Sequence, residues 1–465
     1  MDSDVMTRLF GTNGIRGVVN QEMNSALALG IGQAWGTYLK KTIPRPRCAI
    51  GNDARLSNHM LKSAITAGFL STGCDIVDVG LVPTPTLQYS VKEKHFDAGI
   101  IITASHNPPQ FNGIKGTAHD GTELTKDIEE AIEALYFSGN TSPSEWNNVG
   151  HYTTWDGAID LYIEGILSQV DVASIKKQKF HIVLDCGNGA GSLVAPTLLK
   201  KLGCRITELN CLPDGTFPGR HSEPIPENLV MLMKKVPKND ASFGVGLDGD
   251  ADRAIFVDEN GAYIWGDKSL TLAGEYITSK KNGGVTVTPV TTSTCFEKVI
   301  HRNNGSVIYT KVGSPIVAAV MKQNHAVFGG EENGGLIFPE HQYCRDAAMS
   351  LVTILEILVS KQRPLSELIA EIPSYEMLKT KIACPNEKKE RLLNLLAEEM
   401  KGHHDIISID RTDGLKLFMR DGWVLLRPSG TEPMFRVYVE AKKKQDVEQR
   451  ALFYKNLVES LIQHA

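Results

Sequence analysis

The sequence lacks the features that mark secreted and membrane-spanning proteins. Its eight cysteines contain no Cys-x-x-Cys pair, which excludes the common zinc and dithiol motifs and fits the reduced thiols of a cytoplasmic protein. No apolar segment follows Met1, so we expect no signal peptide. The longest apolar helical stretch, residues 347–359, is interrupted by Glu356 and is too short to cross a membrane.

An excess of positive charge is also missing. The chain has 49 Lys and Arg against 54 Asp and Glu, a net charge of −5, which argues against a general nucleic-acid-binding protein. The short basic runs at residues 176–179 and 442–444 are more typical of solvated faces than of binding arms. A hydrophobic content of 42% is ordinary for a globular protein, and 465 residues favour about three domains.

Strand-like and helix-like segments alternate along the chain, which predicts α/β layers. We divide it into residues 1–154, 155–257, 258–372 and 373–465, and in the last part the texture changes to strand, helix, strands and a final helix. The segments expected as strands are 49–51, 75–79, 98–102, 180–184, 241–245, 254–257, 284–289, 306–310, 326–329, 423–426 and 435–439, and those expected as helices are 61–71 and 445–462.

The first motif of chemical interest is Thr-Ala-Ser-His-Asn-Pro-Pro at residues 103–109, directly after the apolar run 98–102. It places the Ser105 hydroxyl at the carboxyl end of a buried strand, with His106 beside it. A hydroxyl in that position is suited to carry or attack a group bound in the crevice there. A lone Ser-His pair is more often only a polar turn, so this motif needs support from elsewhere.

The second motif provides that support with three carboxylates at alternate positions, Asp248, Asp250 and Asp252. Oxygen ligands from a short acidic loop suit Mg²⁺, which favours few carboxylates together with phosphate oxygens. The loop is not an EF-hand, because the downstream bidentate Glu is missing and the flanking segments are strands. A solvated acidic turn explains the aspartates equally well. Arg253 favours the metal site, since an arginine there suits a bound phosphate.

The third motif, Arg-Pro-Ser-Gly-Thr-Glu-Pro at residues 427–433, predicts a phosphate cradle. Ser429, Gly430 and Thr431 offer hydroxyls and successive backbone N–H groups in a tight loop. Arg427 and Arg436 lie at its edges and add charged donors.

A glycine-rich loop at residues 329–335 presents Glu331 and Asn333, a carboxylate and an amide that suit sugar hydroxyls. Taken alone this signal is weak, because such loops are common turn material. A second glycine run, at residues 185–191, fits the dinucleotide fingerprint poorly, so no dinucleotide is expected.

Together these motifs resemble those of the α-D-phosphohexomutase superfamily. The resemblance covers essentially the whole chain, from Gly-Thr-Asn-Gly-Ile-Arg-Gly at residues 11–17 to the loop at 427–433, and the serine and aspartate motifs in this order are highly specific. It implies three similar α/β domains with mixed sheets and a smaller C-terminal α+β domain around a central cleft. It also implies interconversion of hexose 6-phosphate and hexose 1-phosphate through a phosphoserine and a hexose 1,6-bisphosphate, which also acts as activator.

The resemblance assigns roles to matching positions. Ser105 would be the phosphoserine, and its phosphate would join Asp248, Asp250 and Asp252 in binding one Mg²⁺ per active site. The remaining implied residues are Arg16, His106, Lys115 and Arg253 around the reacting phosphoryl group, Glu331 and Asn333 at the sugar hydroxyls, and Arg427, Ser429, Gly430, Thr431 and Arg436 at the other phosphate.

Many members of the family have a histidine where this chain has Gly335, and some have another where it has Ser314. Acid/base work then falls to Lys115 or His106. The family also often has serine at the position of Asn333. The opening at residues 9–17 looks like that of phosphoglucosamine mutases, so glucosamine phosphate is the expected substrate. Mannose or glucose phosphate, a phosphopentose, a serine-dependent Mg²⁺-assisted phosphatase and a silent sugar-phosphate binder are the alternatives. Monomer and homo-oligomer both stay open.

Overall fold

The computed structural model describes residues 8–11, 13–430 and 432–465. They form two compact units: unit 1 takes the residues up to 269 and 333–369, and unit 2 takes residues 270–332 and 370–465. Helices α9 (Gly266–Lys281) and α13 (Leu365–Ala370) contain residues of both units. Among the described residues, no helix is both long and apolar enough to span a membrane.

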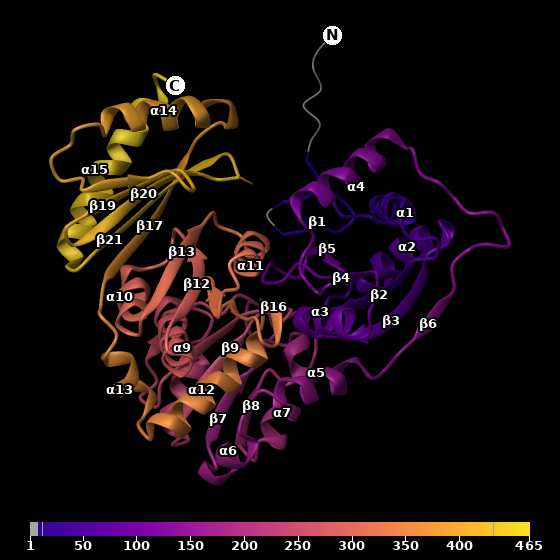
Figure 1. Ribbon diagram of the computed structural model, residues 1–465, viewed down its shortest axis with the longest axis horizontal. Coiled ribbons are helices and arrows are strands. Elements are labelled where there is room, and N and C mark those ends of the chain that lie inside the picture. Colours follow the sequence, from indigo (N-terminus) through magenta and orange to yellow (C-terminus); the bar gives the residue numbers. More distant parts are fainter. Residues whose placement is uncertain (1–7, 12, 431) are drawn as a thin grey trace. The chain divides into compact units, whose positions relative to one another are not determined.

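The first sheet of unit 1 has six strands in the order β1-β5-β4-β2-β3-β6 (Figure 1). Strands β2, β3 and β4 are parallel, whereas β5 runs antiparallel to both of its neighbours. Helical crossovers join the parallel strands, as their direction requires. The elements are β1 (Ile15–Val18), α1 (Ser25–Lys40), β2 (Arg47–Asn52), α2 (Asn58–Ser71), β3 (Asp75–Leu81), α3 (Thr84–Glu93), β4 (Ala98–Ile102), β5 (Phe111–Ala118), α4 (Lys126–Ser138) and β6 (Tyr152–Thr154).

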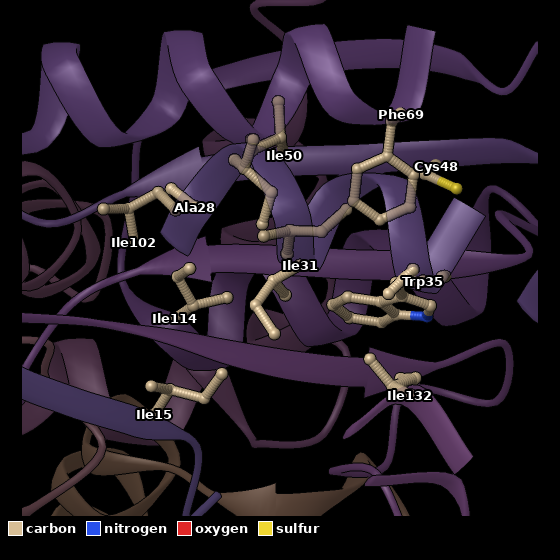
Figure 2. Close-up of a cluster of buried hydrophobic side chains, with 14 of the residues drawn as sticks. Ile15, Ala28, Ile31, Trp35, Cys48, Ile50, Phe69, Ile102, Ile114 and Ile132 are labelled. Atoms are coloured by element: carbon tan, nitrogen blue, oxygen red, sulfur yellow. The ribbon is translucent and has the colours of Figure 1, made fainter. Parts of the chain in front are cut away.

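Alternate residues of strand β4 enter two separate cores, one on each face of this sheet. Ile100 and Ile102 join a cluster with Trp35 of α1 and Phe69 of α2. Figure 2 shows Ile102, Trp35 and Phe69 of this cluster. Ile101 joins a second cluster, to which helix α3 contributes. Burial on both faces explains why the strand is apolar at every position. Each such side chain contributes about 1.5–3 kcal/mol on burial, which fixes the strand that leads to Ser105.

The second sheet of unit 1 has the order β11-β10-β9-β7-β8. Strand β9 is parallel to β7 and antiparallel to β10. The loop at residues 248–253 follows the carboxyl end of β9 and leads into β10. The elements are α5 (Ala158–Leu167), α6 (Val172–Gln178), β7 (His181–Asp185), η1 (Ala190–Leu193), α7 (Ala195–Lys201), β8 (Arg205–Leu209), α8 (Val230–Lys238), β9 (Phe243–Leu247), β10 (Ala254–Val257) and β11 (Tyr263–Ile264).

A short antiparallel pair completes unit 1 and leads into a buried helix. The elements are β15 (Leu336–Phe338), β16 (Gln342–Arg345) and α12 (Ala347–Lys361). The Asp346 side chain caps α12 by accepting a hydrogen bond from the Met349 backbone N–H at 2.9 Å. This cap fixes the backbone directly after Arg345.

Unit 2 combines a parallel arrangement with a fully antiparallel C-terminal sheet (Figure 1). In the first part, β12 pairs in parallel with β13 and β14. The C-terminal sheet has the order β17-β21-β20-β19-β18. The elements are β12 (Gly284–Pro289), α10 (Thr294–Arg302), β13 (Gly305–Thr310), α11 (Ser314–Gln323), β14 (Phe328–Gly330), β17 (Glu376–Ala383), η2 (Asn386–Lys388), α14 (Lys389–Glu399), β18 (Ser408–Asp410), β19 (Leu415–Met419), β20 (Gly422–Pro428), β21 (Met434–Ala441) and α15 (Lys444–Ile462).

The expected α/β fold class is confirmed. The sheets of unit 1 mix parallel and antiparallel strands, and the C-terminal domain is smaller and has an antiparallel sheet. The expected strands and helices are present, with ends that differ by a few residues. Helix α2, for example, begins at Asn58 instead of residue 61, because its first turn carries polar residues that hide the apolar period. The four domain limits stay predictions.

Candidate active site

Ser105 lies on a sharp turn three residues after β4, with its backbone in the left-handed region at φ 52°. Its N–H donates to Thr103 Oγ1 at 2.9 Å, and the residue is fully buried. A left-handed conformation costs a non-glycine residue about 1–2 kcal/mol. The surrounding contacts must therefore hold the turn, and they aim the hydroxyl in one direction.

Arg55 supplies most of those contacts from beneath the turn. Its guanidinium donates to the carbonyl oxygens of Ser105 and Asn107 and also to those of Pro108 and Phe111. The Asp53 carboxylate binds Arg55 Nε at 3.1 Å. Burial raises the pKa of Asp53, although the Arg55 charge opposes that rise. Nothing in the sequence singled out Arg55, since an Asp-x-Arg step after a strand is too common to be a signal.

The aspartate loop meets the Ser105 turn. Ser105 Oγ donates to Asp248 Oδ2 at 3.0 Å, which joins two residues that are 143 positions apart. Carboxylate oxygens of Asp248, Asp250 and Asp252 all lie within 4.8 Å of one another, and the three residues are buried. Gly249 permits this approach, because a Cβ there would lie 2.5 Å from the Ser105 carbonyl oxygen. The structure thus brings together the serine and the three predicted metal ligands.

The free oxygens of this triad fit a hard cation. Asp250 Oδ2 accepts from Lys115 Nζ and Thr84 Oγ1, each at 2.6 Å, and Asp252 Oδ2 accepts from Arg345 Nη2. Their Oδ1 atoms are buried and find no hydrogen-bond partner within the described part of the chain. Buried carboxylate oxygens without donors are costly unless a cation fills the gap.

Opposing effects set the protonation of the triad. Burial, followed by the charges of Asp252 and Asp250, raises the pKa of Asp248 well above its usual range. Burial alone would also raise the pKa of Asp250. The charge and hydrogen bond of Lys115, together with the Thr84 hydrogen bond and the Arg345 charge, outweigh burial and hold that pKa below its usual range. A divalent cation would lower the pKa of all three carboxyls by direct charge attraction.

Cationic groups contact the serine turn and the aspartate loop. Lys115 is 2% exposed, and Arg253 Nε lies 3.7 Å from Asp252 Oδ1. Arg16 Nη1 donates to Asn107 Oδ1 at 3.0 Å. Arg16 Nε and Arg253 Nε are buried and have no hydrogen-bond partner among the described residues, so both N–H groups suit a phosphate oxygen.

His106 lies against the serine, with Nδ1 3.4 Å from Ser105 Oγ. The Arg253 charge, then burial and the Arg16 charge, lower the pKa of His106 to about 2. Its imidazole is therefore uncharged at neutral pH in this state.

Arg345 is a further cation of the site that sequence reasoning missed. The only local signal for it is an Arg-Asp step before an apolar helix.

The predicted sugar-binding residues follow strand β14. Glu331 is buried directly after this strand and belongs to unit 2. Asn333 belongs to unit 1, where its Oδ1 accepts from the Gly335 N–H at 3.1 Å. The amide oxygen of Asn333 thus already shapes its own loop. Ser314, where some family members have a histidine, is buried at the start of α11 in unit 2.

The predicted phosphate cradle lies between β20 and β21 of unit 2. Arg436 Nη2 lies 3.4 Å from Ser429 Oγ and 2.9 Å from Glu432 Oε2. Arg427 Nη2 binds Asp413 Oδ2 at 2.9 Å. Gly430 lies in the same loop with open space where a Cβ would be, whereas Thr431 lies outside the described residues.

Lys389, at the start of α14, fastens this loop and was missed by sequence reasoning. Its Nζ donates to the carbonyl oxygens of Ser429 and Glu432, each at 2.6 Å. Burial lowers the pKa of Lys389, and the nearby Arg436 charge adds to the shift. Positive charge and fixed backbone together make the loop suited to an anion.

Known domain families match the chain in order. The descriptions are phosphoglucomutase/phosphomannomutase alpha/beta/alpha domain I at residues 7–142, domain II at 160–261, domain III at 265–375 and the C-terminal domain at 380–453. The first contains the Ser105 turn, the second the aspartate loop and the last the Arg427 loop.

Individual proteins are similar over nearly the whole length. A phosphoglucomutase/phosphomannomutase from Thermococcus kodakarensis is 44% identical over 463 residues, 99% of each chain. A probable phosphoglucosamine mutase from Methanopyrus kandleri is 40% identical over 440 residues, 95% of each chain. A crystal structure of a phosphoglucomutase/phosphomannomutase family protein from Burkholderia thailandensis superposes with a TM-score of 0.85 at 28% identity, covering 95% of this chain and 96% of that one.

Proposed function

The chain belongs to the phosphoglucomutase/phosphomannomutase family, and we propose that it interconverts a hexose 6-phosphate and a hexose 1-phosphate, with glucosamine phosphate as the preferred substrate. Enzymes of this kind are isomerases that move a phosphoryl group within one sugar. The observation that carries the proposal is the 3.0 Å contact between Ser105 Oγ and Asp248 Oδ2 inside a buried carboxylate triad.

We propose that Ser105 carries a phosphoryl group and exchanges it with the sugar. A sugar hydroxyl attacks the phosphorus of phosphoserine and gives its proton to the uncharged imidazole of His106. The bond from phosphorus to Ser105 Oγ breaks, and the leaving oxygen takes a proton from the Lys115 ammonium. The hexose 1,6-bisphosphate turns around, and its other phosphate returns to Ser105 by the reverse step. Added bisphosphate acts as activator because it recharges a serine that has lost its phosphate.

Charge neutralisation is the main task of the remaining residues. Asp248, Asp250 and Asp252 would hold Mg²⁺, which would neutralise the charge on the transferring phosphoryl group when bound. Arg16 and Arg253 contribute the buried N–H groups that lack partners among the described residues. The Arg427 loop would hold the phosphate at the other end of the sugar.

The choice of sugar has one competing candidate. The relative that is 44% identical is named for glucose and mannose phosphates, whereas the one that is 40% identical is named for glucosamine phosphate. We give glucosamine phosphate first because the opening at residues 9–17 looks like that of phosphoglucosamine mutases. Glucose or mannose phosphate is the second candidate.

Two measurements test the proposal. Intact mass should show a phosphate on the purified protein that Ser105→Ala removes together with turnover, while Ser138→Ala, at an exposed position of α4, keeps both. Turnover of glucosamine, mannose and glucose 1-phosphates by protein charged with a bisphosphate should be fastest for glucosamine. Equal rates would overturn the sugar preference. Net release of inorganic phosphate from Ser105 would show a phosphatase instead.

A further inference from the structure

Within the described part of the chain, Asp250 and Asp252 of the proposed metal-binding triad each accept hydrogen bonds through one oxygen only, although Arg253 Nε lies 3.7 Å from Asp252 Oδ1. Lys115 Nζ lies 2.6 Å from Asp250 Oδ2 and 3.3 Å from Asp252 Oδ2, so one ammonium contacts one carboxylate oxygen of each residue. Thr84 Oγ1 adds a second donor to Asp250 Oδ2. In the described residues, the buried Oδ1 atoms accept no hydrogen bond.

Arg345 is the second donor to Asp252 Oδ2. Its side chain is held at the guanidinium by Asp252 and at the backbone by the cap of α12. Its side chain is 5% exposed and its Nη2 binds Asp252 Oδ2. Its stem crosses the face of Gly335, where a Cβ would lie 2.3 Å from Arg345 Cδ. The next residue, Asp346, accepts from Tyr162 Oη and Gln342 Nε2 and caps α12.

The loop that carries Gly335 is itself fixed to the metal-binding segment. Gly334 O accepts from the Ala254 N–H at 3.1 Å, one residue after Arg253. Gly334 has φ 91°, and a Cβ there would lie 2.6 Å from the Ala254 carbonyl oxygen. The space that Arg345 crosses is therefore shaped by backbone, and the guanidinium has little freedom to leave Asp252.

We propose that Arg345 is a positioning residue that, together with Lys115, confines Asp252 to binding a metal through Oδ1 alone, and so selects Mg²⁺ over Ca²⁺. Ca²⁺ takes six to eight oxygens and readily accepts a carboxylate through both of its oxygens. Mg²⁺ demands near-octahedral geometry and retains waters, so a carboxylate that offers a single oxygen suits it better. The inference rests on the proposed function only in requiring that the triad binds a divalent cation.

The test is calorimetric titration of full-length protein of one phosphorylation state with MgCl₂ and, separately, with CaCl₂. Arg345→Gln removes the guanidinium and its charge, so that the longer Lys115 contact becomes the main one at Asp252 Oδ2. We expect the affinity for Ca²⁺ relative to Mg²⁺ to rise about 10-fold, the scale on which residues behind metal ligands act. The ratio is the readout because the loss of one positive charge strengthens the binding of both cations alike.

Two further variants keep the result decisive. Arg345→Lys keeps the charge but offers a compact ammonium on a shorter stem, so the ratio should shift in the same direction by a smaller factor. Arg363→Gln removes the same charge from an exposed ion pair with Glu367 and should leave the ratio unchanged. Circular dichroism establishes folding, and Arg345→Lys carries the test alone if Arg345→Gln does not fold.

The outcomes separate the two proposals. If the wild type binds neither cation, the metal part of the proposed function is wrong. If the wild type binds Mg²⁺ and the Arg345 variants keep the wild-type ratio, the role of Arg345 is wrong and the proposed function stands.

Discussion

Arg55 Nη2 donates a hydrogen bond to the carbonyl oxygen of Ser105 at 2.9 Å from a guanidinium that is almost completely buried. The arginine follows one strand of the first sheet and the serine follows the neighbouring strand. A buried cation thus supports the backbone of the proposed phosphate carrier without contacting its hydroxyl. Loss of the Arg55 side chain is therefore expected to disturb the backbone of the Ser105 turn.

Replacing Arg55 by Ala should destabilise the protein strongly. The change leaves the Asp53 carboxylate buried without its cation, and breaking a buried pair costs about 3–5 kcal/mol. Urea denaturation measures the loss. Arg45→Ala is the matched control, because Arg45 forms a similar pair with Asp75 at 2.9 Å on the exposed surface and should change stability far less. Equal losses in the two variants would contradict the buried role.

Replacing Gly249 by Ala should slow the reaction without unfolding the protein. The new Cβ would lie 2.5 Å from the Ser105 carbonyl oxygen, so the serine turn and the aspartate loop must separate. A small displacement of reacting groups costs about 100-fold in rate. Steady-state kinetics and a thermal melt measure the two effects, and an unchanged kcat would show that the loops tolerate the separation.

Glu129 should make stability depend on pH. Burial raises its pKa from 4.5 to about 8, so the folded protein binds this proton more tightly than the unfolded chain does. The free energy of unfolding therefore falls as pH rises from about 4.5 to about 8 and levels off above that range. Glu129→Gln should remove this decline, and so gain stability relative to the wild type as the pH rises.

Denaturation at a series of pH values checks this behaviour. Glu145→Gln is the control, because Glu145 is exposed and its loss should leave the decline in place. A wild-type profile that is flat over this range would contradict the prediction.

Replacing Lys389 by Met should weaken sugar-phosphate binding more than it slows catalysis. The lysine fixes the carbonyl oxygens of Ser429 and Glu432 and adds positive charge beneath the loop. We expect KM to rise about 10-fold with a smaller change in kcat, since we propose that the loop holds the phosphate that does not react. Lys388→Met is the control, because Lys388 donates to the Ile462 carbonyl oxygen instead. An equal effect of both changes would point to a general loss of α14.

Sequence patterns predicted the elements better than the supports of the site. Strand β4 was predictable because a run of isoleucines fits burial on both faces of a parallel sheet. The clustering of the three aspartate carboxylates was predictable because they are neighbours in the chain. The contact of Asp248 with Ser105 spans 143 positions and followed from the family resemblance, not from local pattern.

Arg55, Arg345 and Lys389 could not be predicted, for a common physical reason. Each acts through hydrogen bonds to a backbone or carboxylate far away in the sequence, and a single arginine or lysine carries no periodic signal. Nor could the sequence show which oxygen of Asp252 is occupied, because this depends on where Arg345 and Lys115 converge. Such residues become visible only when the chain is folded.

The Arg345 side chain fills the space that a side chain at position 335 would need, since a Cβ at Gly335 would clash with Arg345 Cδ. The two positions are therefore expected to change together over evolutionary time. Relatives with a larger residue at the first should have a smaller or differently directed residue at the second, and swapping only one of the pair between relatives should be more damaging than swapping both.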